Sequence, residues 1–288
     1  MQHSCPFAAR GQLALLLLLV ALGCALSATA QQQLAPATPL AIGQTFTLAS
    51  RVLGETRRIN VYMPPGPPDS ARAALPVLYM PDGGMAEDFL HVAGLVQVLV
   101  GNGTMRPFLL VGIENTERRR DLTGPTTDPQ DRKIAPRVGG SAAFRQFLRQ
   151  ELMPEVAKRY RVTTEKAIIG ESLAGLFVVE TLLAEPDLFD TYLAFDPSLW
   201  WNKERLLQTA PDFARQYKGP PKVLYMAASS QPDIARATRE LGVILQQAAN
   251  PRLTVMALSL PLETHQTIYH PAALLGLRAV FSPSLSKK

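Results

Sequence analysis

The segment that most constrains the fold of this chain is residues 170–175, which read Gly-Glu-Ser-Leu-Ala-Gly. A short apolar run, 167–169, precedes it, and a longer apolar run, 176–179, follows it. The pattern predicts a strand, a tight turn centred on Ser172 and then a helix, an arrangement whose strained turn raises the serine hydroxyl above the sheet edge. The usual pattern has glycine at the position of Ala174, and alanine is still small enough for the strand and helix to approach closely.

Strand-like and helical segments alternate between residues 42 and 284. Strands are expected at 45–51, 57–63, 76–80, 108–113, 167–169, 192–195, 222–227 and 253–260, and helices at 89–100, 141–156, 203–216, 233–249 and 271–281, besides the helix after Ser172. Strands separated by helices predict one α/β domain with a mostly parallel central sheet and helices on both faces. Residues 114–140 carry many charges, prolines and glycines, so we expect a long loop there, on the side of the sheet that carries Ser172.

The first thirty residues are expected to be a signal peptide. Arg10 is their only charge, an apolar run follows it, and residues 28–30 (Ala-Thr-Ala) fit the small-x-small cleavage pattern. Export to the periplasm or the extracellular space is therefore expected, with residues 31–41 as a flexible leader. The apolar run is too short for a permanent membrane span, so no stable membrane insertion is expected after cleavage. Lipid attachment at Cys24 is a less favoured alternative, because the residues before it fit a lipoprotein site poorly.

Composition excludes several other classes of function. Both cysteines, Cys5 and Cys24, precede the expected cleavage site, so the exported chain would form no disulfide and no thiolate metal site. The formal net charge of +5 is small for 288 residues, and no basic repeat interleaved with aromatic residues favours nucleic acid as a partner. We expect neither a metal nor an organic cofactor, and the sequence does not define an oligomeric state.

A serine hydroxyl is a weak nucleophile and needs a base within hydrogen-bond reach. Where a serine occupies a turn of this kind, an acid and then a histidine follow it along the chain. His265 lies just after the last expected strand, where that base belongs. His91 precedes the serine on an apolar helix, and His270 stands directly before Pro271 and is expected to precede the terminal helix.

The acid that would orient this histidine is open to several interpretations. Asp233 is the favoured candidate, because it is the only carboxylate in the loop after the strand at 222–227. It could instead begin the following helix, where an acidic residue favours the N-terminal dipole. Asp196, directly after the strand at 192–195, and Glu263, two residues before His265, are the alternatives, together with a dyad that lacks an acid.

A tetrahedral intermediate at Ser172 would need two hydrogen-bond donors for its oxyanion. The backbone N–H of Leu173 is expected to be one of them. The second is expected from the loop at 82–85, which reads Asp-Gly-Gly-Met, with Gly83 as the candidate because glycine lets the backbone approach a substrate. An ordinary Asp-Gly turn is the alternative interpretation of this loop.

Several segments together resemble the putative esterase family of α/β-hydrolases, and in particular its branch of siderophore (enterochelin) esterases; the family also includes S-formylglutathione hydrolase and the mycolyltransferases. The matching segments are 77–83, 111–115, 170–177, 196–202 and 263–265. The resemblance implies the α/β-hydrolase fold, with Ser172 as nucleophile, His265 as base and the Asp-Gly loop in the oxyanion hole.

The chain departs from the family pattern at two places that concern the acid. The family's Pro-Ser-Leu-Trp-Trp segment usually follows a serine, and here Asp196 stands at that position. The loop after the strand at 222–227 often carries a glutamate, and here it reads Ser-Ser-Gln-Pro-Asp. The resemblance therefore implies a serine and a histidine but leaves the third catalytic residue open.

These observations predict an exported serine hydrolase that cleaves a small-molecule carboxylic ester through an acyl-enzyme, with a siderophore trilactone of the enterobactin type as one substrate class. Trp200 and Trp201 are expected to contribute an aromatic wall, and Arg119, between two further arginines, could bind an anionic substrate. A solvated surface turn is the alternative interpretation of the three arginines. An acyltransferase on the same machinery, or a binding protein that keeps the fold without catalysis, would be an alternative function.

Overall fold

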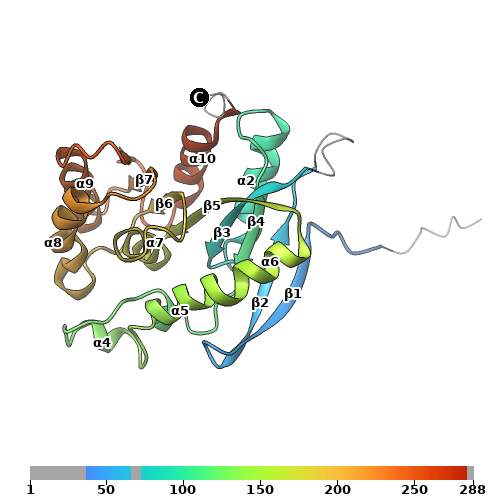
Figure 1. Cartoon of the computed structure of the whole chain (residues 1–288), viewed down its shortest axis with the longest axis horizontal. Helices are drawn as coiled ribbons and strands as arrows, with labels where there is room; N and C mark the ends of the chain where they lie inside the picture. The colour runs from blue at the N-terminus through green and yellow to red at the C-terminus, as the bar shows by residue number, and fades with distance from the viewer. Residues whose placement is uncertain (1–36, 66–72, 284–288) are drawn as a thin grey trace, which may run out of the picture. The chain divides into compact units, whose positions relative to one another are not determined.

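Eight strands form one sheet in the order β1-β2-β4-β3-β5-β6-β7-β8 (Figure 1). The first two pairings, β1 with β2 and β2 with β4, are antiparallel, and all the others are parallel. This confirms the predicted mostly parallel sheet of the α/β-hydrolase fold. The strands are β1 (Gln44–Ser50), β2 (Glu55–Tyr62), β3 (Leu75–Pro81), β4 (Leu109–Ile113), β5 (Val162–Glu171), β6 (Thr191–Phe195), β7 (Lys222–Ala228) and β8 (Leu253–Ser259).

The structure is a computed structural model that describes residues 37–65 and 73–283. The expected signal peptide, its cleavage site, Cys24 and most of the expected leader lie outside these residues. Among the described residues, no helix has both the length and the apolar character needed to cross a membrane.

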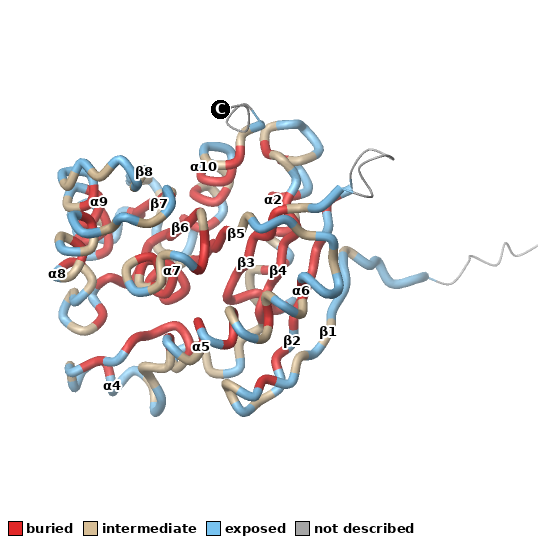
Figure 2. Tube along the Cα trace, in the orientation of Figure 1, coloured by how far each residue is buried: buried red, intermediate tan, exposed pale blue. Residues whose placement is uncertain are grey.

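Helices cover both faces of the sheet and define two apolar cores. Alternate residues of one strand point to opposite faces, so Val77 and Tyr79 of β3 join the core beneath α5 to α9, and Leu78 and Met80 join the core beneath α2 and α10. Figure 2 shows the central strands buried between these layers. The helices are α2 (Phe89–Gly101), α3 (Arg118–Asp121), α4 (Asp131–Ile134), α5 (Ser141–Phe147), the π-helical turn η2 (Leu148–Leu152), α6 (Met153–Arg159), α7 (Leu173–Ala184), α8 (Trp201–Gln216), α9 (Pro232–Gln247) and α10 (Tyr269–Phe281).

Two of the segments that differ from the sequence expectation lie at residues 114–140 and at the start of α8. The expected loop at 114–140 contains the short helices α3 and α4, whose four residues are too few to leave a periodic apolar pattern. The helix expected from residue 203 begins at Trp201, and its residues 202–204 have positive φ, so the chain turns left-handed there before the regular helix. The backbone N–H of Asn202 in this turn donates to Asp131 Oδ2 at 2.8 Å. This hydrogen bond holds α8 against the segment that carries α4.

The parallel strands all end at the same edge of the sheet. Ligands of open α/β sheets bind beyond the carboxyl ends of such strands. The segments that follow β3, β5, β6 and β8 at this edge contain, respectively, Asp82, Ser172, Asp196 and His265. The topology therefore brings together residues that are up to 183 positions apart in the sequence.

Candidate active site

Ser172 occupies a strained turn between β5 and α7. Its φ of 61° and ψ of −119° lie in a region that residues with a side chain rarely adopt. The turn is tight because small residues flank it: a Cβ on Gly170 would lie 2.7 Å from the Cβ of Ala174, and one on Gly175 would lie 2.9 Å from the carbonyl oxygen of Phe195. The local sequence therefore folds as the elbow that its pattern predicts.

His265 reaches the serine from the segment between β8 and α10. Its Nε2 lies 3.0 Å from Ser172 Oγ, within hydrogen-bond distance. The structure thus brings the predicted nucleophile and the predicted base together across 93 residues of sequence. His91 and His270 lie elsewhere, with their rings 5.0 Å apart.

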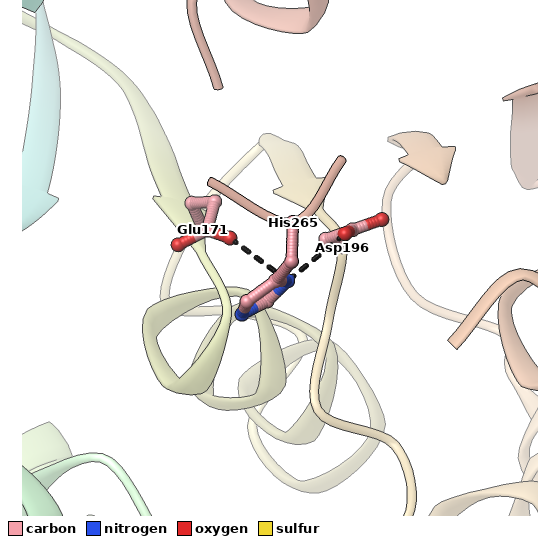
Figure 3. A group of neighbouring side chains, drawn as sticks. All are labelled: Glu171, Asp196 and His265. Carbon is pink, nitrogen blue, oxygen red and sulfur yellow. Dashed lines mark hydrogen bonds and ion pairs between the residues drawn. The ribbon is translucent and has the colours of Figure 1, made fainter. Parts of the chain in front are cut away.

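The carboxylate that contacts the base is Asp196. Its Oδ2 lies 2.9 Å from His265 Nδ1 (Figure 3), whereas Ser172 Oγ contacts the other ring nitrogen, Nε2. Asp196 is fully buried, and it also accepts hydrogen bonds from the amide and from the hydroxyl of Ser229, both at 2.6 Å. The pKa of His265 is raised, first because it donates a hydrogen bond to Asp196 and further by the negative charge of Asp196 and, where Glu171 is ionised, of Glu171, against opposing contributions from burial and from Arg118.

The structure does not place Asp233 beside His265, and this position contradicts the favoured prediction for the acid. Asp233 is exposed in the first turn of α9, which is the alternative helix-start position that the sequence also allowed. Glu263 accepts a hydrogen bond from Thr267 Oγ1 at 2.7 Å instead of contacting the base. Asp196 is the acid that reaches the site because β6 pairs directly with β5, and the residue after β6 therefore lies beside the end of β5.

The backbone donors for an oxyanion agree with the prediction only in part. Leu173 is the first residue of α7, where a backbone N–H has no acceptor within the helix. The N–H of Gly83 donates to the carbonyl of Ile113 at 3.0 Å, so it is engaged in the fold and the structure argues against its predicted role. Gly84 N donates to Glu87 Oε2 at 2.7 Å, and Met85 N has no acceptor among the described residues.

Gly83 has a packing role instead. A Cβ at this position would lie 2.3 Å from the Cα of Gly112 and from the backbone nitrogen of Ile113. Only glycine therefore lets the segment after β3 lie against β4. The neighbouring Asp82 accepts two hydrogen bonds from Arg118, at 2.7 and 2.8 Å, and this bidentate pair holds the segment in place.

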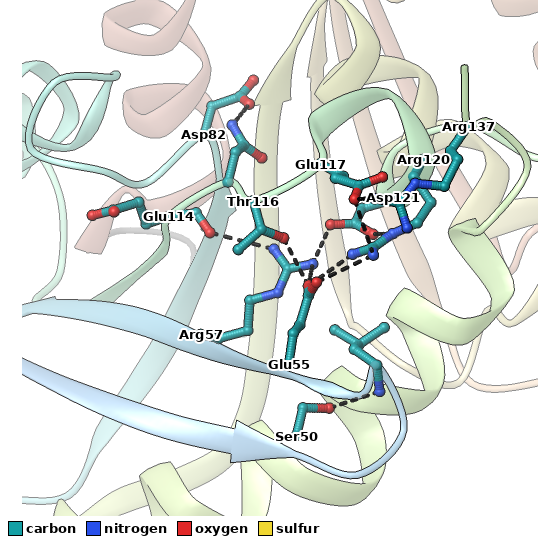
Figure 4. A network of polar contacts seen from close by, with 12 residues as sticks. Ser50, Glu55, Arg57, Asp82, Glu114, Thr116, Glu117, Arg120, Asp121 and Arg137 are labelled. Carbon is teal, nitrogen blue, oxygen red and sulfur yellow. Dashed lines mark hydrogen bonds and ion pairs between the residues drawn. The ribbon is translucent and has the colours of Figure 1, made fainter. Parts of the chain in front are cut away.

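The three consecutive arginines have different surroundings. Arg118 is bound to Asp82, and Arg120 contacts both Glu55 and Asp121 in a polar network that also contains Arg57 (Figure 4). Arg119 is exposed, and its side chain forms no ion pair within the described part of the chain. A cavity of about 600 Å³ lies over this segment, and its lining is residues 117–120 and 135–137. Arg119 is thus the arginine whose charge remains free to meet an anion.

The two tryptophans also divide between fold and surface. Trp201 is buried, and its indole nitrogen donates to the carbonyl of Gly124 at 2.9 Å. Trp200 is 37% exposed, with its ring centre 5.9 Å from that of Trp201. Of the two tryptophans, only Trp200 presents a ring surface that a ligand could reach.

Glu171 is a residue of the site that the sequence analysis missed. Its Oε1 lies 3.4 Å from His265 Nδ1, opposite Asp196 (Figure 3). Burial raises its pKa to about 8. The signal that could have found it is its position, because a charged residue stands directly before the nucleophile at the buried end of a strand.

Glu171, Asp196 and His265 also have the composition of a metal-binding group, with ligand atoms within 4.8 Å of one another. We assign no metal to them, because Asp196 Oδ2 and His265 Nδ1 are joined to each other by a hydrogen bond.

The names of several curated relatives of this chain describe them as siderophore esterases. Over 58% of its length the chain is 32% identical to the ferri-bacillibactin esterase BesA of Bacillus subtilis. Over 52% of its length it is 30% identical to the siderophore triacetylfusarinine C esterase of Aspergillus fumigatus. The matches span 62% and 53% of these two relatives, so the chain covers less than two thirds of either.

Solved structures and a family model agree with this similarity. The IroE-like serine hydrolase of Shewanella oneidensis superposes with a TM-score of 0.74 at 30% identity, over 83% of this chain and 80% of that one. The enterobactin esterase FES of Shigella flexneri, at 19% identity over 87% of this chain and 61% of that one, shares the fold with a TM-score of 0.67. The family model described as "Putative esterase" matches residues 50–239, which is more than half of the sequence. The chain therefore belongs to the putative esterase family.

Proposed function

We propose that this protein is an exported serine esterase that hydrolyses a carboxylic ester through an acyl-enzyme. The observation that carries the proposal is the chain of hydrogen bonds from Ser172 through His265 to Asp196. Ser172 Oγ lies 3.0 Å from His265 Nε2, and His265 Nδ1 lies 2.9 Å from Asp196 Oδ2. Nucleophile, base and orienting carboxylate in this geometry define a catalytic triad irrespective of sequence order.

The chemistry follows from these contacts. Ser172 Oγ attacks the ester carbonyl carbon while His265 Nε2 takes the hydroxyl proton, and the buried Asp196 stabilises the imidazolium that forms. The N–H of Leu173 donates to the oxyanion of the tetrahedral intermediate. His265 then gives its proton to the departing alcohol. In the second half, His265 takes a proton from water, and the resulting attack on the acyl-enzyme releases the carboxylic acid and restores Ser172.

We further propose siderophore esters as the substrate class. The names of the relatives support this proposal, and so does Arg119, which lines a cavity formed by residues 117–120 and 135–137 and not by Ser172 or His265. A ferric catecholate is strongly anionic, and an exposed guanidinium with no ion-pair partner suits such a ligand. Trp200 offers an aromatic surface to an aryl group.

The test compares simple p-nitrophenyl esters with a cyclic catecholate trilactone, with and without bound iron, for the wild type and Ser172→Ala. We expect turnover of both classes, a higher kcat/KM for the trilactone, and no turnover by Ser172→Ala. Ester hydrolysis that survives Ser172→Ala would overturn the serine mechanism. Equal or lower kcat/KM for the trilactone would overturn the substrate class alone. Analysis of the products with an added acceptor alcohol separates hydrolysis from acyl transfer.

Export is proposed from the first thirty residues, with their single charge, apolar run and Ala-Thr-Ala site. Expression of the full chain in a Gram-negative host, followed by N-terminal sequencing of the periplasmic fraction, tests it. We expect a chain that begins at Gln31. Retention of the intact N-terminus in the cytoplasm would contradict the proposal, and a lipid-modified Cys24 in the membrane fraction would support the alternative anchor.

A further inference from the structure

Two carboxyl groups face the same nitrogen of the catalytic histidine. Asp196 Oδ2 lies 2.9 Å from His265 Nδ1, and Glu171 Oε1 lies 3.4 Å from that same nitrogen (Figure 3). The two acids come from the ends of adjacent strands, β5 and β6, and approach the ring from opposite sides. A single acid suffices to orient a triad histidine, so the second carboxyl group calls for its own explanation.

The surroundings of the two acids differ in a way that suggests different roles. Asp196 is fully buried and is fixed by the amide and hydroxyl of Ser229. The Oε1 atom of Glu171 is also buried, yet it has no hydrogen-bond partner among the described residues. A buried carboxyl oxygen without a partner is costly. Glu171 is therefore not explained as a structural tether, and its Oε1 faces His265 Nδ1 at 3.4 Å.

The charges around Glu171 set its protonation state. The titratable and charged groups that face it are His265 from the segment before α10, Arg118 from α3, Asp196 after β6, Asp82 after β3 and Tyr269 from α10. The pKa of Glu171 is raised to about 8, first by burial and also by the charges of the two aspartates, while His265 and Arg118 oppose the shift. The group is therefore mostly neutral at pH 7 and becomes a carboxylate at mildly alkaline pH.

We propose that Glu171 is a second positioning residue for His265. When Glu171 is ionised and Asp196 does not accept the hydrogen bond from the N–H at His265 Nδ1, Glu171 accepts this hydrogen bond instead. The inference rests on the proposed serine-esterase function. In the wild type, ionised Glu171 adds a second negative charge beside the imidazole and so stabilises the imidazolium that forms when Ser172 loses its proton. The protein would thereby gain activity on the alkaline side, where Glu171 is ionised.

The experiment is a double-mutant cycle on p-nitrophenyl butyrate, with kcat and KM measured from roughly pH 6 to 9.5. The variants are Asp196→Ala, Glu171→Gln and the double variant, with Ser172→Ala as the background for spontaneous hydrolysis. Glu263→Gln is the matched control, because this carboxylate lies on the segment of His265 but bonds to Thr267. Thermal unfolding of each variant confirms that it is folded.

In the Asp196→Ala background we expect a residual kcat that rises as the pH increases through the pKa of Glu171, which lies below its wild-type value of about 8 because a neighbouring charge that raises it is gone. Adding Glu171→Gln should remove this rise and lower kcat by a further factor of about ten or more, with little change in KM. In the wild-type background, Glu171→Gln alone should remove an alkaline increase in kcat, and Glu263→Gln should leave the profile unchanged.

Equal effects of Glu171→Gln in both backgrounds, with unchanged pH profiles, would overturn the proposal and leave Glu171 as a packing residue. If Asp196→Ala does not fold, the pH profile of Glu171→Gln alone decides the question. Failure of the proposed function has a different signature, because the wild type would then show no turnover above Ser172→Ala at any pH.

Discussion

Asp196 and Ser229 lie in direct contact at the carboxyl ends of adjacent strands, with two hydrogen bonds of 2.6 Å from Ser229 to the aspartate. Asp196 directly follows β6 and accepts these hydrogen bonds from the residue that follows β7, while its Oδ2 also lies 2.9 Å from His265 Nδ1. The contact with Ser229 therefore fixes the carboxylate that faces the base.

The first prediction separates Asp196 from Asp233 as the triad acid. Asp196→Ala should lower kcat by at least about 100-fold, because His265 loses the partner that fixes its tautomer and stabilises its charge. Asp233→Asn should leave kcat unchanged, because this side chain is exposed in the first turn of α9. Steady-state kinetics with p-nitrophenyl butyrate measure both, and a large loss in Asp233→Asn would contradict the assignment.

The second prediction concerns the acid side of the pH–rate profile. His265 must be neutral in the free enzyme to take the serine proton, so kcat/KM falls as the pH drops through its pKa. That pKa is raised by the hydrogen bond to Asp196, so the fall should begin above the ordinary histidine value of about 6.5. In Asp196→Ala the midpoint should move to lower pH. A midpoint that stays fixed in this variant would show that Asp196 does not control His265.

The third prediction concerns stability and Glu171. Its folded pKa of about 8 lies above its ordinary value of 4.5, so the folded state binds more protons than the unfolded state between these values. The free energy of unfolding therefore decreases as the pH rises from 4.5 to 8. Glu171→Gln should remove this decrease. At pH 8 the free energy of unfolding of the variant should exceed that of the wild type by more than about 1 kcal/mol. Urea denaturation at pH 5 and pH 8 measures it, and a variant less stable than the wild type at pH 8 would refute the assigned burial cost.

The fourth prediction tests the close approach after β3. Gly83→Ala should destabilise the fold by about 3 kcal/mol or more, because its Cβ would overlap the backbone of Gly112 and Ile113. Gly94→Ala is the matched control within α2, where a Cβ meets no atom within 4 Å and alanine should stabilise the helix by up to about 1 kcal/mol. Thermal unfolding distinguishes the two, and equal midpoints would contradict the packing argument.

The fifth prediction tests Arg119 as the residue that binds an anionic substrate. Arg119→Ala should raise KM for a ferric catecholate ester roughly tenfold at low salt, with a smaller effect at high salt because the charge is exposed. The KM for neutral p-nitrophenyl butyrate should not change. Arg239→Ala, an exposed arginine on α9, serves as the control. The same increase in KM for both esters would exclude a charge-specific contact.

The local sequence was sufficient to predict the elements that carry the site. The apolar runs on either side of residues 170–175 and the small residues within them require a strand, a turn and a helix, since these preferences act over a few neighbouring residues. The position of His265 after the last strand was also readable, because chain order in this fold places the base there. The mostly parallel sheet followed from the alternation of strands and helices.

The tertiary structure decided which groups meet. Asp196, Asp233 and Glu263 all follow strands that end at one edge of the sheet, and the sequence could not rank them by distance to His265. Only the lateral order of the strands, with β6 beside β5, places Asp196 against the base and leaves Asp233 in solvent. The engagement of the Gly83 amide by Ile113 and the approach of Glu171 to His265 depend likewise on contacts across the fold. The sequence by itself thus predicted the serine and the histidine that meet at the elbow, together with the scaffold that carries them. Which carboxyl groups face His265, and which backbone donors remain unbonded, depended on pairing between strands that are distant in the chain.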